Sequence, residues 1–523
     1  MKKQLYVIVC GLLSLSAAQA QPLLKTHVET GDVEGVLDGT DLAIYKAIPF
    51  AAPPVGDLRW KEPQPAQPWE GVLKADDYAK WPPQPERGDV SYDMMSEDCL
   101  YLGIATPAKS VDDALPVMVY IHGGSFQTEH YGGTMFECLA RRGVVTVSIE
   151  YRAGALGFLA HPDLAKESAE GHTGNYGLLD QIFALKWIQR NIKNFGGDPS
   201  KVTIFGESAG AMSCNVLCAS PLAKGLFRAC ISESGAFMSP SYAVRQKQAE
   251  QIGLAFQQQL QKSSIEELRQ MDTRSLTGTG VNFQGNLPII DGYVLTDDVY
   301  HLYERGEYID VPVLIMHNSD EGAASGDFTM AEYNQQMQGI PGQFADSAKV
   351  CYPATTDEEA NFSLRDMIRD YVFGWPAYAW TTLQKKTGKS PVYSAYCAQK
   401  SERTVYAKGN RRGAAHADDL MYINGGFKKE DADQYPEEVK LSEIMQQYWV
   451  NFAKTGNPNG EGLPYWPVYD EKEPTVMQFN NGATLIMQPN ADKIALMDNL
   501  FKWIRNIMGM MNNQQTNQQT NQQ

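Results

Sequence analysis

The chain has 523 residues, of which 43% are hydrophobic and 20% are charged, and its formal net charge is −17 at pH 7. This composition is typical of a globular protein with a large core, and it excludes a fibrous or wholly disordered chain. The strong negative charge disfavours nucleic acid and anionic membrane surfaces as partners. It is compatible with neutral or cationic small-molecule substrates.

The first 20 residues have the pattern of a secretory signal. Two lysines near the start precede an apolar run over residues 5–15, and the A-Q-A of residues 18–20 forms a cleavage site. The apolar run is too short to span a bilayer comfortably. We therefore expect cleavage between Ala20 and Gln21, no stable membrane anchor, and a secreted or periplasmic mature protein.

The cysteines do not indicate a metal site. The chain contains eight cysteines, and one of them lies in the signal segment. The remaining seven form no Cys-x-x-Cys pair and no Cys/His cluster at zinc spacing. A disulfide framework is not needed in a chain of this size.

The first half of the mature chain predicts several strands and one long helix. Residues 27–60 alternate strand-like runs with turns, and residues 61–98 are rich in proline and tryptophan, which favours surface loops. The apolar runs LPVMVYI (115–121) and VVTVSIE (144–150) predict buried strands of a parallel sheet. Residues 176–195 have apolar side chains at helical spacing and end at a Gly-Gly pair, which predicts a helix.

The next strand leads into the motif G-E-S-A-G, from Gly206 to Gly210. Residues 202–205 are β-branched or aromatic, and the segment after the motif can be helical to about Ala219. Strand, G-x-S-x-G and helix is the context of a nucleophile elbow. Such a turn requires an unfavourable backbone angle at Ser208, and side chains at the two glycines would crowd the neighbouring chain. We therefore expect Ser208 to be an exposed nucleophile.

The second half of the chain is richer in helices. Residues 240–275 predict two helices, and the second begins with a capping box from Ser264 to Glu267. Further expected elements are a core strand over 311–316, a helical segment over 357–386 with interruptions at Gly374 and Pro376, a strand over 391–398, and helices over 441–454 and 490–508.

The alternation of strands and helices predicts a parallel sheet covered by helices. We find no internal repeat and no linker, and so we expect residues 21–508 to form a single catalytic domain with helical insertions. Residues 509–523 are polar and of low complexity, and we expect them to be a disordered tail.

A serine nucleophile requires a general base, an acid that orients the base, and N–H donors for the oxyanion. In α/β-hydrolases the chain order is serine, acid, histidine. Three histidines follow Ser208, namely His301, His317 and His416. If the acid lies at the end of the 311–316 strand, His416 is the only histidine downstream of it.

Two carboxylates directly follow that strand, Asp320 and Glu321, and Asp418 and Asp419 are less favoured alternatives. Catalytic groups gather just past the ends of parallel strands in open α/β sheets, which favours the first pair. The spacing alone does not separate Asp320 from Glu321.

The loop Gly123-Gly124-Ser125 follows the 115–121 strand and fits the second part of an oxyanion hole. Glycines allow the backbone to approach a tetrahedral intermediate and to point N–H groups at it. Phosphate binding is disfavoured, because neither a Walker lysine nor a G-x-G-x-x-G motif follows the strand.

Several longer motifs resemble one family. FGGDPSKVTIFGESAG (195–210) is similar to the serine signature of the type-B carboxylesterase/cholinesterase family. The segments EDCLYL, YKAIPFAAPPVGDLRW, EYRAGALGFL, GNYGLLDQ and WVNFAKTGNPNG resemble other blocks of that family in the same order. The resemblance covers roughly residues 25–505. It implies an α/β-hydrolase fold, with a large, mostly parallel central sheet, helices on both faces and helical insertions around an active-site gorge.

The resemblance also implies a catalytic triad of Ser208, Glu321 and His416, and it thereby selects Glu321 over Asp320. Cys99, in the EDCLYL block, usually pairs with an upstream cysteine in the family, and the mature chain has none there. We therefore expect that disulfide to be absent.

For the oxyanion, the resemblance implies donors at the N–H groups of Gly124, Ser125 and Ala209. Ser125 stands where the family usually has a small residue or a third glycine, which makes the pocket wall more polar. The candidate substrate-pocket residues are Glu207, beside the nucleophile, and the aromatic Phe126 and Phe237.

We therefore expect a serine carboxylesterase that hydrolyses small-molecule esters through an acyl-enzyme on Ser208, with no metal or organic cofactor. One alternative is a non-catalytic adhesion or binding protein, since the resembled family includes such members, but those lack triad residues that this chain retains. Another is the same machinery acting on thioesters, carbamates or lactones.

Overall fold

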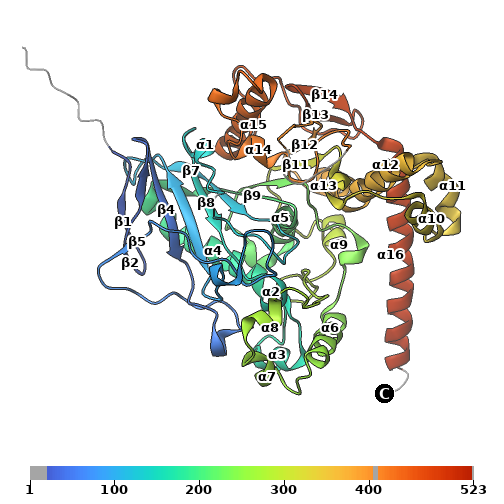
Figure 1. Cartoon of the computed structure of the whole chain (residues 1–523), viewed down its shortest axis with the longest axis horizontal. Helices are drawn as coiled ribbons and strands as arrows, with labels where there is room; N and C mark the ends of the chain where they lie inside the picture. The colour runs from blue at the N-terminus through green and yellow to red at the C-terminus, as the bar shows by residue number, and fades with distance from the viewer. Residues whose placement is uncertain (1–20, 133, 404–409, 521–523) are drawn as a thin grey trace, which may run out of the picture.

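The computed structural model describes residues 21–132, 134–403 and 410–520, and the predicted signal segment lies outside them. An 11-stranded sheet forms the centre of the molecule (Figure 1). Its strands are β3 (Val36–Asp38), β4 (Leu42–Pro49), β6 (Tyr101–Thr106), β7 (Leu115–Ile121), β8 (Val145–Ile149), β9 (Gly197–Glu207), β10 (Ala229–Glu233), β11 (Val313–Asn318), β12 (Val392–Cys397), β13 (Thr475–Phe479) and β14 (Ala483–Met487).

The spatial order of the strands is β14-β13-β12-β11-β10-β9-β7-β8-β6-β4-β3. The central strands from β13 to β8 pair in parallel. Antiparallel pairs occur only toward the two edges, between β13 and β14 and from β8 through β6 and β4 to β3. The prediction of a large, mostly parallel sheet is therefore confirmed. A separate three-stranded sheet contains β1 (Lys25–Val28), β2 (Gly31–Glu34) and β5 (Val72–Lys74).

The helices are α1 (Glu137–Ala140), α2 (Gly154–Phe158), α3 (Pro162–Glu167), α4 (Tyr176–Asn191), α5 (Ala209–Ala219), α6 (Gln246–Gln259), α7 (Ile265–Arg269), α8 (Thr273–Thr277), α9 (Val299–Glu304), α10 (Met330–Gln338), α11 (Gly342–Cys351), α12 (Asp357–Ile368), α13 (Trp375–Thr387), α14 (Leu420–Ile423), α15 (Pro436–Thr455) and α16 (Ala491–Thr520).

Helices cover both faces of the sheet. The sequence of β7 explains this, because its side chains are apolar on both faces. Val117, Val119 and Ile121 belong to a buried cluster that includes α4 and α5. Met118 and Tyr120 belong to a second cluster that includes α15. Because successive side chains of a strand point to opposite faces, a run that is apolar throughout needs cover on both sides.

The segment predicted over 357–386 is helical throughout, and the interruption expected at Gly374 and Pro376 takes the form of a change in helix type. A π-helical turn, Arg369–Gly374, joins α12 to α13. Pro376, the second residue of α13, has no N–H to donate, and the irregular π-helical turn lies directly before it, where the α-helical hydrogen-bond pattern is broken. The last helix, α16, continues past residue 508, where we expected it to end, since no proline follows.

The segment over 240–275 contains three helices, α6, α7 and α8, rather than two. Ser264 caps α7, and its hydroxyl accepts a hydrogen bond from the N–H of Glu267 at 3.2 Å. The Glu267 carboxylate accepts from the N–H of Ser263 rather than Ser264. The cap therefore differs from a strict capping box by one residue.

All seven cysteines of the described chain are free, and Cys99 is fully buried. Cys99 therefore forms no disulfide with any described residue. Among the described residues, we find no helix with the length and apolar character needed to span a bilayer.

Replacing Gly210 by alanine should destabilise the protein, because the new Cβ would lie 1.9 Å from the carbonyl oxygen of Ile121 in β7. Overpacking typically costs about 1–3 kcal/mol, and here the neighbouring atom is backbone and cannot rotate away. Thermal unfolding should show a lower midpoint than that of the wild type. Gly342→Ala is the matched control, since a Cβ there meets no atom within 4 Å. Equal midpoints for the two variants would contradict the close packing of α5 on β7.

Candidate active site

Ser208 lies between β9 and α5 in a conformation that serine rarely adopts. Its backbone angles are φ 56° and ψ −122°. The N–H of Ser208 donates to the carbonyl oxygen of Glu233 in β10 at 2.9 Å, and its carbonyl oxygen accepts from the N–H of Met212 at 2.9 Å. The neighbouring strand and the helix therefore hold the strained turn. The sequence predicted both the elements and the unfavourable angle.

One histidine and one carboxylate continue from the serine in a chain of hydrogen bonds. His416 Nε2 lies 2.9 Å from Ser208 Oγ, and His416 Nδ1 lies 2.6 Å from Glu321 Oε2. The other carboxylate oxygen of Glu321 accepts from the N–H of Asn318 at 2.7 Å. Glu321 is 1% exposed, so its orientation is set by these contacts rather than by solvent.

The other acids bond to different partners. Asp320 accepts from the N–H of Arg412 at 2.7 Å, and Asp418 accepts from the N–H of Ala415 at 2.8 Å. Asp419 accepts from the side-chain amide of Asn318 at 2.7 Å. None of these carboxylates is hydrogen-bonded to His416 in the described structure. Among these four acids, Glu321 alone is hydrogen-bonded to His416 Nδ1 in the described structure.

The other two histidines that follow Ser208 in the chain contact different residues. His301 is on α9 and bonds to Glu304 at 2.7 Å. His317 is buried near the end of β11, where its ring packs against Tyr396.

The loop after β7 approaches the nucleophile closely. A Cβ on Gly123 would lie 3.1 Å from Ser208 Cβ and 2.9 Å from the carbonyl oxygen of Glu207, so a larger residue would push the loop away. The N–H groups of Gly124, Ser125 and Ala209 donate no hydrogen bond to any residue in the described parts of the chain. They are therefore available to an oxyanion bound at Ser208.

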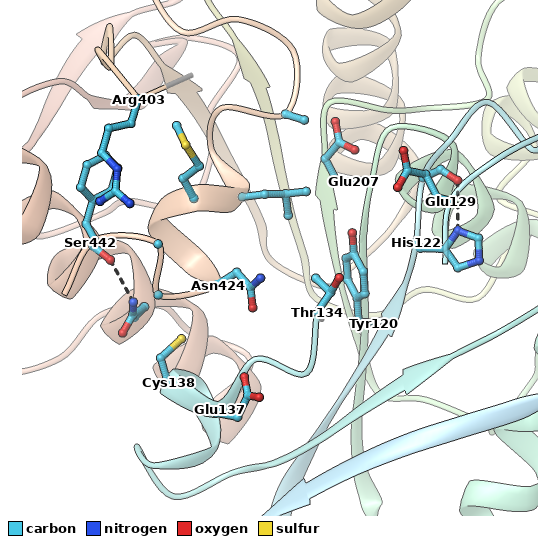
Figure 2. A pocket seen from close by; sticks show the side chains of 18 of the residues that line it. Tyr120, His122, Glu129, Thr134, Glu137, Cys138, Glu207, Arg403, Asn424 and Ser442 are labelled. Atoms are coloured by element: carbon cyan, nitrogen blue, oxygen red, sulfur yellow. Dashed lines mark hydrogen bonds between the residues drawn. The ribbon is translucent and has the colours of Figure 1, made fainter. Parts of the chain in front are cut away.

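A cavity of about 1150 Å³ opens over Ser208 and His416. Figure 2 shows it extending from Glu207 and His122 to Asn424 and Ser442. Glu207 therefore lines the cavity, as the sequence suggested for a pocket residue.

The two aromatic pocket candidates lie elsewhere. Phe126 is 1% exposed and packs edge-on against Phe158, while Phe237 is 3% exposed and stacks on Tyr242. Neither lines the cavity, and both belong to the main buried cluster. Their large apolar rings contribute more to the core than they would to a wall that is lined mostly by polar and charged side chains.

Burial and neighbouring charges shift the acid–base groups around Ser208. Burial raises the pKa of Glu207 to about 8. Burial opposes protonation of His416, but the Glu207 and Glu321 carboxylates outweigh it and raise the pKa of His416 to about 9. Glu207 Oε1 lies 3.3 Å from His416 Nε2. Burial also raises the pKa of Asp419 to about 7. The imidazole thus lies among carboxyl groups that favour its protonated form.

The sequence did not point to two polar residues, Asn318 and Glu233, that end strands beside the site. Asn318 ends β11 and bonds both to Glu321 and, through its side chain, to the Ala415 carbonyl oxygen at 2.8 Å. Glu233 ends β10, and its carboxylate accepts from the Trp449 indole at 2.5 Å. A polar residue at a strand end was the available signal for Asn318. Glu233 could not be recognised as a residue at a strand end, because β10 was not predicted.

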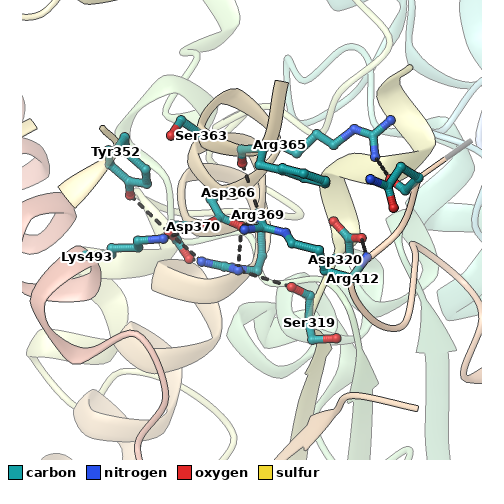
Figure 3. A network of polar contacts seen from close by, with 12 residues as sticks. Ser319, Asp320, Tyr352, Ser363, Arg365, Asp366, Arg369, Asp370, Arg412 and Lys493 are labelled. Carbon is teal, nitrogen blue, oxygen red and sulfur yellow. Dashed lines mark hydrogen bonds and ion pairs between the residues drawn. The ribbon is translucent and has the colours of Figure 1, made fainter. Parts of the chain in front are cut away.

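A network of charged side chains holds the histidine loop (Figure 3). The carboxylate of Asp366, on α12, accepts from Arg369 Nη1 at 2.9 Å and from Lys493 Nζ at 2.6 Å, and it also pairs with Arg412. Arg412 precedes His416 by four residues in the chain. The network therefore joins α12 and α16 to the loop that carries His416.

The same network reaches the loop that carries Glu321. Arg369 Nη1 donates to the Ser319 carbonyl oxygen at 3.1 Å, and the Asp320 carboxylate accepts from the N–H of Arg412. The segments that precede the histidine and the acid are thus bonded to each other and to one helix. This arrangement restrains the two loops relative to one another.

Replacing Asp366 by asparagine should lower the unfolding temperature at neutral pH, because three cations lose a carboxylate that is 9% exposed. Breaking a buried ion pair typically costs about 3–5 kcal/mol. Burial opposes ionisation of Asp366, but Arg369 and Lys493 hold its pKa below the ordinary value. A lowered folded-state pKa contributes stability above the unfolded pKa, and this is lost as pH falls through the folded pKa. The difference between variant and wild type should therefore shrink at acidic pH.

Thermal unfolding between neutral and acidic pH measures this difference. Asp346→Asn is the control, since Asp346 is exposed on α11. A destabilisation by Asp366→Asn that stayed constant across the acidic range would argue against an ionic contribution.

Comparison with known proteins places this site in context. The sequence matches the carboxylesterase family over residues 21–497. It is 34% identical to fumonisin B1 esterase of Sphingopyxis macrogoltabida over 509 residues, which cover 91% of this chain and 90% of that protein. It is also 34% identical to carboxylesterase 1F of Mus musculus over 525 residues, which cover 89% and 91% of the two chains.

The fold agrees with these matches. The structure resembles the solved structure named PNB esterase with a TM-score of 0.76 and 32% sequence identity. The match covers 92% of this chain and 100% of that chain.

Proposed function

Because the chain belongs to the carboxylesterase family and is a carboxylic ester hydrolase, we propose that it acts through a triad of Ser208, His416 and Glu321. The observation that carries this proposal is the continuous path of hydrogen bonds from Ser208 Oγ through both ring nitrogens of His416 to Glu321. A nucleophile, a base and an orienting acid are the parts that acyl transfer requires.

In the first half of the reaction, Ser208 Oγ attacks the carbonyl carbon of the ester while His416 Nε2 takes its proton. The carbonyl oxygen becomes an oxyanion, which accepts hydrogen bonds from the N–H groups of Gly124, Ser125 and Ala209. His416 then gives the proton to the departing alkoxide oxygen. The alcohol leaves, and the acyl group remains on Ser208.

In the second half, water replaces the alcohol. His416 Nε2 removes a proton from the water as it attacks the acyl carbon, and the second oxyanion forms in the same position. Collapse of this intermediate returns the proton to Ser208 Oγ and releases the carboxylic acid. Glu321 accepts the Nδ1–H of His416 throughout, so the ring keeps the tautomer whose Nε2 faces the serine.

The proposed substrates are small-molecule esters. We place the mature protein outside the cytoplasm, in the periplasm or the medium, on the basis of the signal pattern in residues 1–20, which lie outside the described residues.

Labelling with a fluorophosphonate tests the nucleophile. We expect one adduct on Ser208 in the folded wild type, located by mass spectrometry of the peptides, and none in Ser208→Ala. His416→Ala should reduce ester turnover by at least about 10³-fold with an unchanged unfolding temperature. A folded wild type that forms no adduct would overturn the proposal and favour a non-catalytic binding protein.

Replacing Glu207 by glutamine should move the pH profile of ester hydrolysis. The Glu207 carboxylate raises the pKa of His416, and the base must be neutral to accept a proton. Without that charge the pKa of His416 falls, so the rise of kcat/KM with pH should occur at lower pH. Profiles measured with an uncharged ester give the comparison.

Glu443→Gln is the matched control for this prediction. Glu443 lines the same cavity, and no hydrogen bond or ion pair in the described chain joins it to His416. An equal shift in both variants would show a general field effect and would contradict the specific coupling between Glu207 and His416.

A further inference from the structure

The loop from His122 to His130 holds two of the proposed oxyanion donors in a strained conformation. Three residues in it that are not glycine have positive φ angles: Ser125 at 56°, Phe126 at 59° and Glu129 at 85°. Side chains disfavour this region, and such conformations persist only where the surroundings determine them. The loop therefore needs contacts that fix it from outside.

A buried carboxylate bonds to both ends of this loop. Glu150 follows β8 directly and is 0% exposed. One of its oxygens lies 2.7 Å from His122 Nε2, and the other pairs with His130 Nδ1. Both imidazoles are buried as well. One side chain thus connects the first and last residues of the loop, and neither contact depends on solvent.

The charges support a carboxylate at this position. Burial would raise the pKa of Glu150, but His122 and His130 outweigh it and lower that pKa. A glutamine in its place would present an amide N–H group to one of two ring nitrogens that both donate when Glu150 is ionised. A glutamine can therefore bond to both rings only if one imidazole changes its tautomer, which also changes the contact of His122 Nδ1 with the Gly123 carbonyl oxygen, 3.2 Å away.

The segment that follows Glu150 donates hydrogen bonds to carbonyl oxygens of the loop. The Tyr151 hydroxyl donates to the His122 carbonyl oxygen at 2.9 Å, and the two rings stack. The N–H of Gly154 donates to the Phe126 carbonyl oxygen at 2.6 Å. These bonds use acceptors of the loop and leave the N–H groups of Gly124 and Ser125 without partners in the described chain.

We propose that Glu150 is a positioning residue for ester hydrolysis: by bonding His122 and His130 it fixes the loop that presents the Gly124 and Ser125 N–H groups to the oxyanion. This proposal rests on the proposed function. Glu150 does not line the cavity over Ser208, so it acts through the loop and not on the substrate. Donors that are displaced from the oxyanion lose transition-state stabilisation while substrate binding is retained.

The first test is Glu150→Gln. We expect kcat to fall by about 10-fold to 10²-fold with KM little changed, because the oxyanion contacts form only in the transition state. Rates are normalised to the fraction of active sites labelled at Ser208. Glu250→Gln is the matched control, since Glu250 is also buried but bonds to Gln246 and Lys247 on α6. Its kcat should equal that of the wild type.

The second readout is the affinity of a trifluoromethyl ketone, which forms a tetrahedral adduct on a serine and carries an oxyanion. Its inhibition constant should rise in Glu150→Gln by about the factor by which kcat/KM falls. A purely structural role would lower the active fraction or the unfolding temperature without changing this constant. An unchanged kcat, or a fall in kcat/KM with an unchanged inhibition constant, would overturn the proposal.

A second pair of variants tests the same contact if Glu150→Gln does not fold. Asparagine at position 130 places an amide N–H near the position of His130 Nδ1, whereas leucine has the same shape without a donor. We expect His130→Asn to retain most of kcat and His130→Leu to lose about as much as Glu150→Gln. Equal kcat values for the two would contradict the proposal. Failure of the wild type to form a Ser208 adduct would instead contradict the proposed function.

Discussion

The backbone of Ser208 is held at a positive φ angle by the hydrogen bond from its N–H to Glu233 in β10 and by the close packing of α5 on β7. A serine adopts this conformation only if strand and helix leave no alternative. The rest of the site depends on it. The turn exposes Oγ at the carboxyl ends of the parallel strands, where the loop after β7 supplies N–H groups and the loop after β11 supplies Glu321. A flatter turn would move the nucleophile out of reach of both.

The site contains more carboxyl groups than the proposed reaction uses. Glu321 bonds to His416 Nδ1 and is the proposed orienting acid, while Glu207, Asp419 and Glu233 lie buried nearby with pKa values that burial raises. The charges of Glu207, Glu321 and Asp419 favour a protonated imidazole, the form that the proposed attack by Ser208 would produce. The same charges disfavour the neutral base that begins the reaction. The protonation state of His416 thus depends on how many of the neighbouring carboxyl groups are ionised. Burial raises the pKa of Glu207 and Asp419 and so limits their ionisation.

Two loops without regular structure carry the remaining parts, and each is bonded to a buried carboxylate that several donors share. Asp366 bonds to Arg369, Arg412 and Lys493 and so restrains the loop of His416. Glu150 bonds to both ends of the loop of Gly124 and Ser125. A loop has few internal hydrogen bonds, so its precision comes from contacts with the elements around it. In both cases the carboxylate is buried, and the loop residues that it bonds are 20 or more residues away in the sequence.

The sequence by itself determined the parts of this protein that local patterns encode. The extents of β7 and α5 and the nucleophile turn agree with the prediction, because apolar periodicity and the glycines of the motif act over a few residues. Spacing did not separate Asp320 from Glu321. The strands β6, β10, β13 and β14 were not predicted, and Phe126 and Phe237 lie in the core instead of the pocket. The bonds of Glu150, Asp366 and Asn318 also depend on the tertiary structure. These bonds form because the order and register of the strands bring the residues together in space. A short segment of sequence does not encode that order.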